Sequence, residues 1–275
     1  MKRRRLLSIM SVVLTGALFL TGCGSSSAKD DENVFRVGME AGFAPYNWTQ
    51  MDDSNGAVKI DGSTEYAGGY DVEMAKKIAE ELGKELVIVK TEWDGLIPAL
   101  NSDKIDAIIA GMASTAERQE AIDFTDAYHD SKLVLVVKSD GSYANATSLK
   151  DFNGAKVTAQ LNTFHYDLID QIEGVKKQPA IESFPTMRVA IESGLIDAYV
   201  STYPEGVSAQ YANSNLKMIE TTDGFVLDEE KSKACIGIIK NSDLTEKINK
   251  ILSEIPNEEK KELMDNAILN QPVAQ

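Results

Sequence analysis

The stretch that decides the fold runs from Trp93 to Tyr128, with the sequence WDGLIPALNSDKIDAIIAGMASTAERQEAIDFTDAY. Its centre, KIDAIIA at residues 104–110, is a short apolar run typical of a strand buried in the middle of a parallel sheet. Small residues follow at positions 111, 113 and 114, so backbone N–H and C=O groups are expected to lie open at the carboxyl end of this strand.

A helix is predicted to begin directly after these small residues. Ser114 and Glu117 fit the spacing of a capping box, which places Arg118 in the first turn of the helix. A helix N-terminus, open amides and a guanidinium fork all favour a small carboxylate. Because ligands of open α/β sheets bind at the carboxyl ends of the strands, this arrangement predicts a pocket for a small acid.

Short strand patterns alternate with helical patterns from Val34 onward, which indicates α/β architecture. Strands are expected at Val34–Met39 and Leu86–Val89. Between them, apolar residues at helical spacing mark one face of a helix that Gly83 ends: Val72, Ala75, Ile78, Ala79 and Leu82. Residues 48–68 are polar and contain glycine, which predicts a surface loop.

The N-terminus has the pattern of an export signal. Four basic residues at positions 2–5 precede an apolar run at 6–20 that is too short to span a membrane. The sequence LTGC that ends at Cys23 looks like a lipobox, so we expect a signal peptide at residues 1–22 and a lipid on Cys23. Residues 23–33 then form the lipidated cysteine and a flexible tether. The alternative is an uncleaved signal anchor, which the small residues before Cys23 disfavour.

Charge and cysteine content narrow the possible functions. Removal of residues 1–22 takes away four basic residues and no acidic ones, so the formal net charge moves from −15 to −19. Such an acidic chain is a poor candidate for nucleic-acid binding. Cys235 is the only cysteine besides Cys23, so no disulfide is expected within the mature chain. His129 and His165 do not form a metal-binding pair, and we predict neither a metal nor a cofactor.

The whole mature chain resembles the extracellular solute-binding proteins of polar amino acid ABC transporters (solute-binding protein family 3). The resemblance rests on motifs that occur in order at residues 43–46, 69–72, 93–100, 105–112, 115–118, 123–128, 148–154, 163–166 and 194–198. It implies a type II periplasmic-binding-protein-like α/β fold, with two lobes, a hinge and a ligand cleft between the lobes. The implied first lobe comprises residues 34–131 and 233–275, and the second lobe residues 132–232, with crossings near 129–132 and 226–233.

The resemblance also implies roles for residues of one lobe. Arg118 would clamp the ligand's α-carboxylate, with the backbone N–H of Ala113 beside it, while the carbonyl of Gly111 would meet the ligand's amine. Phe43 and Trp93 would sandwich the ligand side chain, although core packing is an alternative for each ring. Glu40 would receive a cationic group at the far end of the ligand, or would end its strand and face water.

On the other lobe, the resemblance implies that the loop of Gln160, Thr163 and Phe164 completes the carboxylate site. The sequence departs from the family at Thr202, where an acidic residue usually pairs with the ligand's amine. A hydroxyl is a weaker partner for an ammonium than a carboxylate. Three alternatives follow: Glu205 contacts the amine, Thr202 and the Gly111 carbonyl hold it alone, or the ligand lacks a standard α-amino group.

The sequence thus predicts a monomeric, lipid-anchored, extracytoplasmic protein that captures an amino acid and delivers it to an ABC permease. Glu40 beside aromatic rings favours a cationic side chain such as that of arginine or lysine. An enzyme similar to cyclohexadienyl dehydratases is the alternative, which the lack of an acid at Thr202 disfavours. A receptor's sensor domain is a third possibility, but no signalling module accompanies it.

Overall fold

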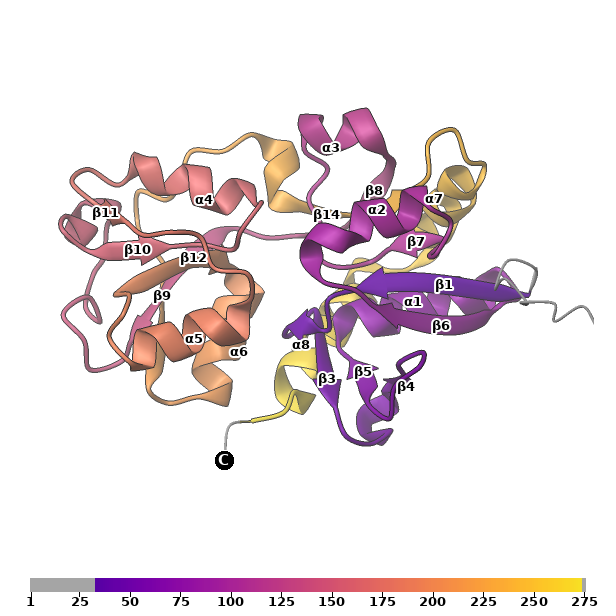
Figure 1. Cartoon of the computed structure of the whole chain (residues 1–275), viewed down its shortest axis with the longest axis horizontal. Coiled ribbons are helices and arrows are strands. Elements are labelled where there is room, and N and C mark those ends of the chain that lie inside the picture. Colours follow the sequence, from indigo (N-terminus) through magenta and orange to yellow (C-terminus); the bar gives the residue numbers. More distant parts are fainter. Residues whose placement is uncertain (1–32, 274–275) are drawn as a thin grey trace, which may run out of the picture. The chain divides into compact units, whose positions relative to one another are not determined.

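The computed structural model describes residues 33–273. The predicted signal peptide, the lipobox cysteine Cys23 and the tether before residue 33 lie outside this range. No helix within it is both long and apolar enough to cross a membrane. The described chain contains two five-stranded sheets and one smaller sheet. Figure 1 shows that the two large sheets belong to separate lobes.

The first large sheet contains the buried strand that the apolar run at residues 104–110 predicts. Its order is β6 (Glu85–Lys90), β1 (Val34–Met39), β7 (Ala107–Ile108), β14 (Lys233–Ile238) and β8 (Asp123–Asp130). The strands predicted at 34–39 and 86–89 are confirmed as β1 and β6. β7 is central, as expected for its apolar residues, but the sheet is mixed because β14 pairs with β7 in the antiparallel direction.

One helix of the first lobe, α1, follows the predicted periodicity. α1 (Tyr70–Glu81) buries the expected apolar face, and the chain turns away at Gly83, which has a φ of 66°. The short η2 (Trp93–Gly95) leads into α2 (Leu96–Asn101). Two C-terminal helices, α7 (Leu244–Glu254) and α8 (Asn257–Asn270), contact α1, so the end of the chain rejoins the lobe in which it begins.

The prediction of a surface loop at residues 48–68 is wrong where strands form, although residues 51–56 are exposed at the surface. This segment forms most of the small antiparallel sheet, ordered β2 (Gly42–Phe43), β3 (Asn47–Gln50), β5 (Tyr66–Gly68) and β4 (Val58–Lys59). The strands are too short for alternation to stand out in a polar sequence. Trp48 anchors them: a Cβ at Gly68 would lie 2.9 Å from its indole, so the ring covers the neighbouring strand closely.

The second large sheet has the order β11 (Lys176–Lys177), β10 (Lys156–Thr158), β12 (Ala198–Thr202), β9 (Leu133–Lys138) and β13 (Leu216–Ile219). Its helices are α4 (Phe164–Leu168), α5 (Phe184–Glu192) and α6 (Tyr203–Ala212). The chain passes between the two large sheets twice, from β8 to β9 and from β13 to β14. Both passages are visible in Figure 1.

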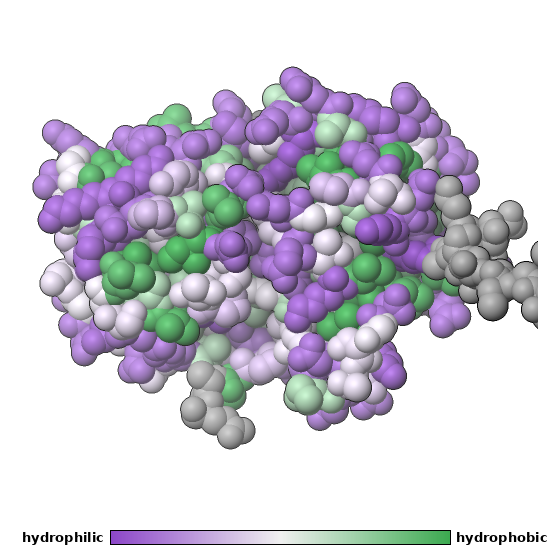
Figure 2. Space-filling view, viewed as in Figure 1, coloured by the Kyte–Doolittle hydropathy of each residue, from purple (hydrophilic) through white to green (hydrophobic). Residues whose placement is uncertain are grey.

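Two clusters of buried apolar residues form the core of the described chain. One lies wholly within the second lobe, around Phe152 and Val200. The other fills the first lobe and continues into the second, because Phe43 of β2 packs against Phe184 of α5. The face drawn in Figure 2 is mostly hydrophilic, with apolar residues in scattered patches, as expected for a strongly acidic chain in water.

Candidate ligand-binding cleft

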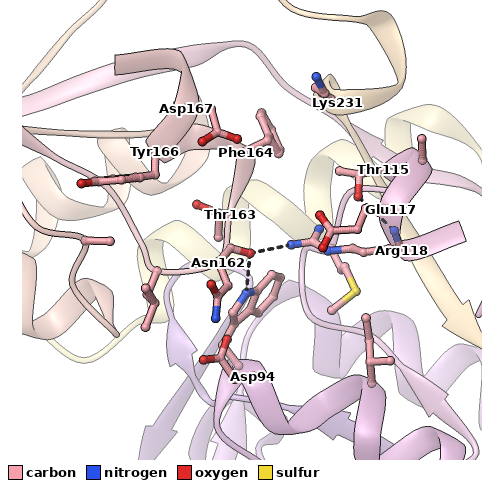
Figure 3. A pocket seen from close by; sticks show the side chains of 16 residues that line it. Asp94, Thr115, Glu117, Arg118, Asn162, Thr163, Phe164, Tyr166, Asp167 and Lys231 are labelled. Atoms are coloured by element: carbon pink, nitrogen blue, oxygen red, sulfur yellow. Dashed lines mark hydrogen bonds between the residues drawn. The ribbon is translucent and has the colours of Figure 1, made fainter. Parts of the chain in front are cut away.

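A cavity of about 900 Å³ lies between the two lobes. The first lobe contributes Trp93 and Arg118, and the second contributes Thr163 and Phe164. These four are the predicted site residues that line it. Figure 3 shows the cavity with Arg118 on one side and the Asn162–Asp167 segment on the other.

The helix that carries Arg118 is α3 (Ala116–Ala121). Its N-cap is Thr115, whose hydroxyl accepts a 3.4 Å hydrogen bond from the backbone N–H of Arg118. The predicted capping box of Ser114 and Glu117 is therefore wrong by one residue. Ser114 is buried instead against β14, where the Cys235 thiol donates to its hydroxyl at 3.8 Å. Arg118 remains in the first turn, as predicted.

The guanidinium of Arg118 is bound only by neutral groups of the described chain. Nη1 donates to the carbonyl of Ala113 at 2.9 Å, and Nη2 donates to the carbonyl of Asn162 at 3.2 Å. Its Cζ lies 5.0 Å from the centre of the Trp93 ring. Burial lowers the pKa of Arg118 to about 10, an effect that the neighbouring Glu117 partly offsets. A half-buried cation with carbonyl and ring partners is well suited to bind a carboxylate.

Asn162 lines the cavity from the side of the second lobe. Its carbonyl accepts from Arg118 and also from the indole N–H of Trp93, at 3.4 Å (Figure 3). The backbone there is left-handed, with a φ of 55°, a conformation that asparagine tolerates better than most residues. Sequence reasoning selected the neighbours Gln160 and Thr163 but missed Asn162. The available signal was its position inside the predicted loop of Gln160, Thr163 and Phe164.

Glu40 lies deeper, outside the lining of the cavity. One carboxylate oxygen accepts from the side-chain amide of Gln160 at 2.9 Å, which joins the two lobes. The other oxygen, Oε1, is buried and has no hydrogen-bond partner among residues 33–273. Burial raises the pKa of Glu40 to about 7, despite the hydrogen bond from Gln160, and Glu92 and Asp71 add to the increase. Oε1 is thus shielded from water, while the residue as a whole is half-buried.

Phe43 also lies outside the cavity lining, and it is 5% exposed. Its ring stacks between Tyr46, at a centroid distance of 4.7 Å, and Phe184, at 4.4 Å. The structure therefore does not bring Phe43 and Trp93 together as two walls of one cavity. Phe184 was missed by sequence reasoning, because an aromatic residue before a proline at a helix start is a common core pattern.

Gly111 follows β7 and contacts the edge of Phe43. A Cβ at this position would lie 2.7 Å from Cε1 of the ring, and the φ of 61° also favours glycine. Its N–H donates to the Tyr128 hydroxyl at 2.9 Å, and that hydroxyl donates to the buried carboxylate of Asp71 at 2.6 Å. Burial raises the pKa of Asp71 to about 6, although hydrogen bonds from Tyr128 and Asn47 oppose this. This network fixes the backbone below the cavity.

Thr202 and Glu205 lie at the end of β12 and the start of α6. The hydroxyl of Thr202 is buried without a hydrogen-bond partner among the described residues. Glu205 is fully buried, and its Oε1 accepts from Nη2 of Arg188 at 2.8 Å and from the hydroxyl of Tyr199 at 2.9 Å. Glu205 is thus engaged within its own lobe through Oε1, although its Oε2, like the Thr202 hydroxyl, has no hydrogen-bond partner among the described residues. Arg188, which sequence reasoning missed, forms an ion pair with Glu205.

A profile of the bacterial extracellular solute-binding proteins, family 3, matches residues 35–268. The chain belongs to this family. The resemblance inferred from the sequence motifs is therefore confirmed, and so is the expected two-lobed α/β fold. The family consists of solute-binding proteins and not enzymes, which decides against the dehydratase alternative.

Two relatives match along most of their length. The arginine-binding extracellular protein ArtP of Bacillus subtilis is 27% identical over 263 residues, which cover 92% of each chain. A probable histidine-binding protein of Campylobacter jejuni is 30% identical, with coverage of 86% of this chain and 90% of the relative. Among solved structures, a mutant of arginine-bound ArgBP from T. maritima is 31% identical with a TM-score of 0.67, covering 82% of this chain and 96% of that one.

The positions of the described side chains also bear on metal binding. Within residues 33–273, no group of three or more histidine, cysteine, aspartate or glutamate side chains is placed to hold a metal ion. His165 is buried beside the cavity, and burial lowers its pKa to about 3, with Arg118 adding to the decrease. The imidazole of His165 is therefore neutral near the guanidinium of Arg118.

Proposed function

We propose that this protein captures an amino acid between its two lobes and delivers it to an ABC permease. The observation that carries this proposal is the half-buried guanidinium of Arg118, whose partners among residues 33–273 are two carbonyl groups and the Trp93 ring. A ligand carboxylate provides the opposite charge that these partners lack. The names of the relatives, which mention arginine and histidine, support an amino acid as the ligand.

We propose further that the ligand has a cationic side chain that reaches Glu40. The Oε1 atom of Glu40 is buried without a hydrogen-bond partner among the described residues, and a guanidinium or ammonium supplies both a donor and a positive charge. The hydroxyl of Thr202 and the carbonyl of Gly111 then accept from the α-amino group. Glu205 has no such role, because Arg188 already neutralises it.

The remaining parts of the proposal concern the whole chain. Lobe 1 comprises residues 34–131 and 233–275, lobe 2 comprises residues 132–232, and the two passages between the sheets act as the hinge. Cleavage before Cys23 leaves a lipid-anchored monomer whose tether holds the lobes outside the membrane. The basic segment at 2–5 and the short apolar run at 6–20 support export.

A ligand panel and one pair of variants test the central claim. Thermal shift measurements with the wild type are expected to show stabilisation by L-arginine, L-lysine or L-histidine, and none by L-glutamate. Isothermal titration should then show that Arg118→Ala weakens binding of the best ligand by about 2 kcal/mol or more, roughly 30-fold, because a charge-assisted pair is lost.

Arg36→Lys is the matched control, because Arg36 forms its ion pair with Asp106 and does not line the cavity. This variant should bind like the wild type. Near-wild-type affinity in Arg118→Ala would remove Arg118 from the site. Stabilisation by L-glutamate but by none of the three basic amino acids would contradict the cationic ligand.

A further inference from the structure

The ring of Phe43 is enclosed on both faces. Tyr46 covers one face at 4.7 Å with an angle of 20° between the ring planes, and Phe184 covers the other at 4.4 Å with an angle of 17°. Gly111 approaches the ring edge so closely that a single added carbon would clash. A ligand side chain therefore reaches a face of Phe43 only if one of the two covering rings moves.

The spacing of the rings leaves no room for a third layer. Atoms in van der Waals contact lie about 3.5–4.0 Å apart, so a flat group between two parallel rings requires a separation of roughly 7 Å. The 4.4 Å between Phe43 and Phe184 is the separation of direct stacking. A guanidinium or an aliphatic chain on this face of Phe43 must replace Phe184.

Phe184 is the ring that can move away. Tyr46 is only three residues from Phe43 and is held by edge contacts with Tyr70 and His129, at 6.3 and 5.6 Å. Phe184 belongs to the other lobe, where it is the first residue of α5. Separation of the lobes therefore removes Phe184 from Phe43 and leaves Tyr46 in place.

We propose that Phe184 is a specificity-determining residue that competes with the ligand side chain for the free face of Phe43. The inference rests on the proposed function, since it concerns which amino acids the cleft accepts. A long side chain that stacks on Phe43 must displace the Phe184 ring, whereas a short side chain leaves the stack intact. The stacking of Phe184 on Phe43 therefore weakens the binding of long side chains. A long side chain binds well only if contacts beyond the ring, such as one with Glu40, compensate for the lost stacking.

Two variants and a matched control test this competition. Phe184→Leu keeps an apolar side chain but removes the stacking ring, and Phe184→Ala removes most of the side chain. Phe152→Leu is the control, because Phe152 is also fully buried in the second lobe and stacks on Tyr143 at 5.4 Å, within the cluster confined to that lobe. Isothermal titration measures the affinity of each protein for L-arginine and for L-alanine.

Phe184→Leu should bind L-arginine about 3- to 10-fold more tightly than Phe152→Leu, because the lost stacking no longer opposes the ligand. Affinity for L-alanine, whose side chain does not reach the ring, should change less than twofold. The affinity of Phe184→Ala for L-arginine should also increase. Binding of L-arginine by the variant when the wild type binds none would also support the proposal.

Four results would overturn it. Weaker binding of L-arginine in both Phe184 variants, with Phe152→Leu unchanged, would mean that Phe184 contacts the ligand instead of competing with it. An equal gain for both amino acids would mean that the stack controls lobe closure and not selectivity. Absence of binding of both amino acids in the wild type and in every variant would refute this inference, and the thermal shifts with L-lysine and L-histidine would then decide the proposed function. Wild-type binding of L-arginine that Phe184→Leu leaves unchanged would refute the inference alone.

Discussion

Two ionisable side chains of opposite charge meet only neutral groups in the described part of the molecule. Arg118 is bound by the carbonyls of Ala113 and Asn162, and Glu40 accepts from the amide of Gln160. Both also change their pKa in the direction that burial imposes, downward for Arg118 and upward for Glu40. A ligand with a carboxylate at one end and a cation at the other balances both charges at once.

At the residue scale, binding of a cationic ligand should depend on pH through Glu40. Burial raises the pKa of Glu40 to about 7, so its protonated form is favoured in mildly acidic solution. A bound guanidinium favours the ionised form, so L-arginine must displace that proton when the pH is below 7. Affinity for L-arginine should therefore fall by up to about tenfold per pH unit from pH 7 toward pH 5, as measured by titration calorimetry in several buffers.

The variant Glu40→Gln provides the control for this pH dependence. It should bind L-arginine more weakly at pH 8, with little change between pH 5 and pH 8. Asp71, whose pKa is also raised, accepts hydrogen bonds from Tyr128 and Asn47, which neither protein changes. Its contribution to the pH dependence is therefore expected to be the same in the wild type and in Glu40→Gln. An affinity of the wild type for L-arginine that stays constant over this range would exclude a direct contact between Glu40 and the cation.

At the scale of elements, the turn between β7 and α3 brings the site together. Gly111 adopts a left-handed conformation and touches Phe43, while its N–H is held by Tyr128. Gly111→Ala should therefore destabilise the protein by more than about 3 kcal/mol, because backbone strain and a steric clash act together. Urea unfolding of the ligand-free protein measures the difference.

Gly154→Ala separates these two causes. Gly154 has a similar φ of 79°, but no atom lies within 4 Å of the position of an added Cβ. Its substitution should reduce the free energy of unfolding by only about 1–2 kcal/mol. Equal losses in the two variants would show that Phe43 yields to the added methyl group, and that the turn is less tightly packed than the distances indicate.

Elements with a clear period could be predicted from the sequence, and those held by distant contacts could not. The helical spacing from Val72 to Leu82 predicted α1, and apolar runs predicted β1 and β6. The small sheet was missed because its strands contain only two to four residues each. The α3 cap was placed one residue early because Ser114 and Thr115 have equivalent hydroxyls, and only burial of Ser114 against β14 distinguishes them.

At the scale of the whole molecule, the candidate site depends on pairs that local sequence patterns do not reveal. The Glu40–Gln160 contact joins residues 120 positions apart, and the Phe43–Phe184 stack joins residues of different lobes. Arg118 and the turn before it could be predicted because a helix start, small residues and a cation are adjacent in sequence. The type II fold itself came from the order of motifs along the chain, which the family match confirms.

The proposed lipid anchor also concerns the whole molecule. We expect the mature protein to sediment with membranes, and Cys23→Ala to yield a precursor that is unprocessed or released. Cys235→Ala is the control, since this buried cysteine lies in the first lobe far from the N-terminus in sequence. Cell fractionation and metabolic labelling with a radioactive fatty acid measure both effects. A Cys23→Ala protein that is still processed, labelled and membrane-bound would show that the lipobox interpretation is wrong.

The position of Trp93 has a practical consequence. The chain contains two tryptophans, and Trp48 is 6% exposed and bonded within the small sheet to Gln50. The indole N–H of Trp93 instead donates to the carbonyl of Asn162 in the other lobe, and Cζ of Arg118 lies 5.0 Å from the centre of the Trp93 ring. We therefore expect the emission of Trp48 to stay constant and that of Trp93 to change on ligand binding, so that the tryptophan fluorescence of the unlabelled chain should report binding in the cleft.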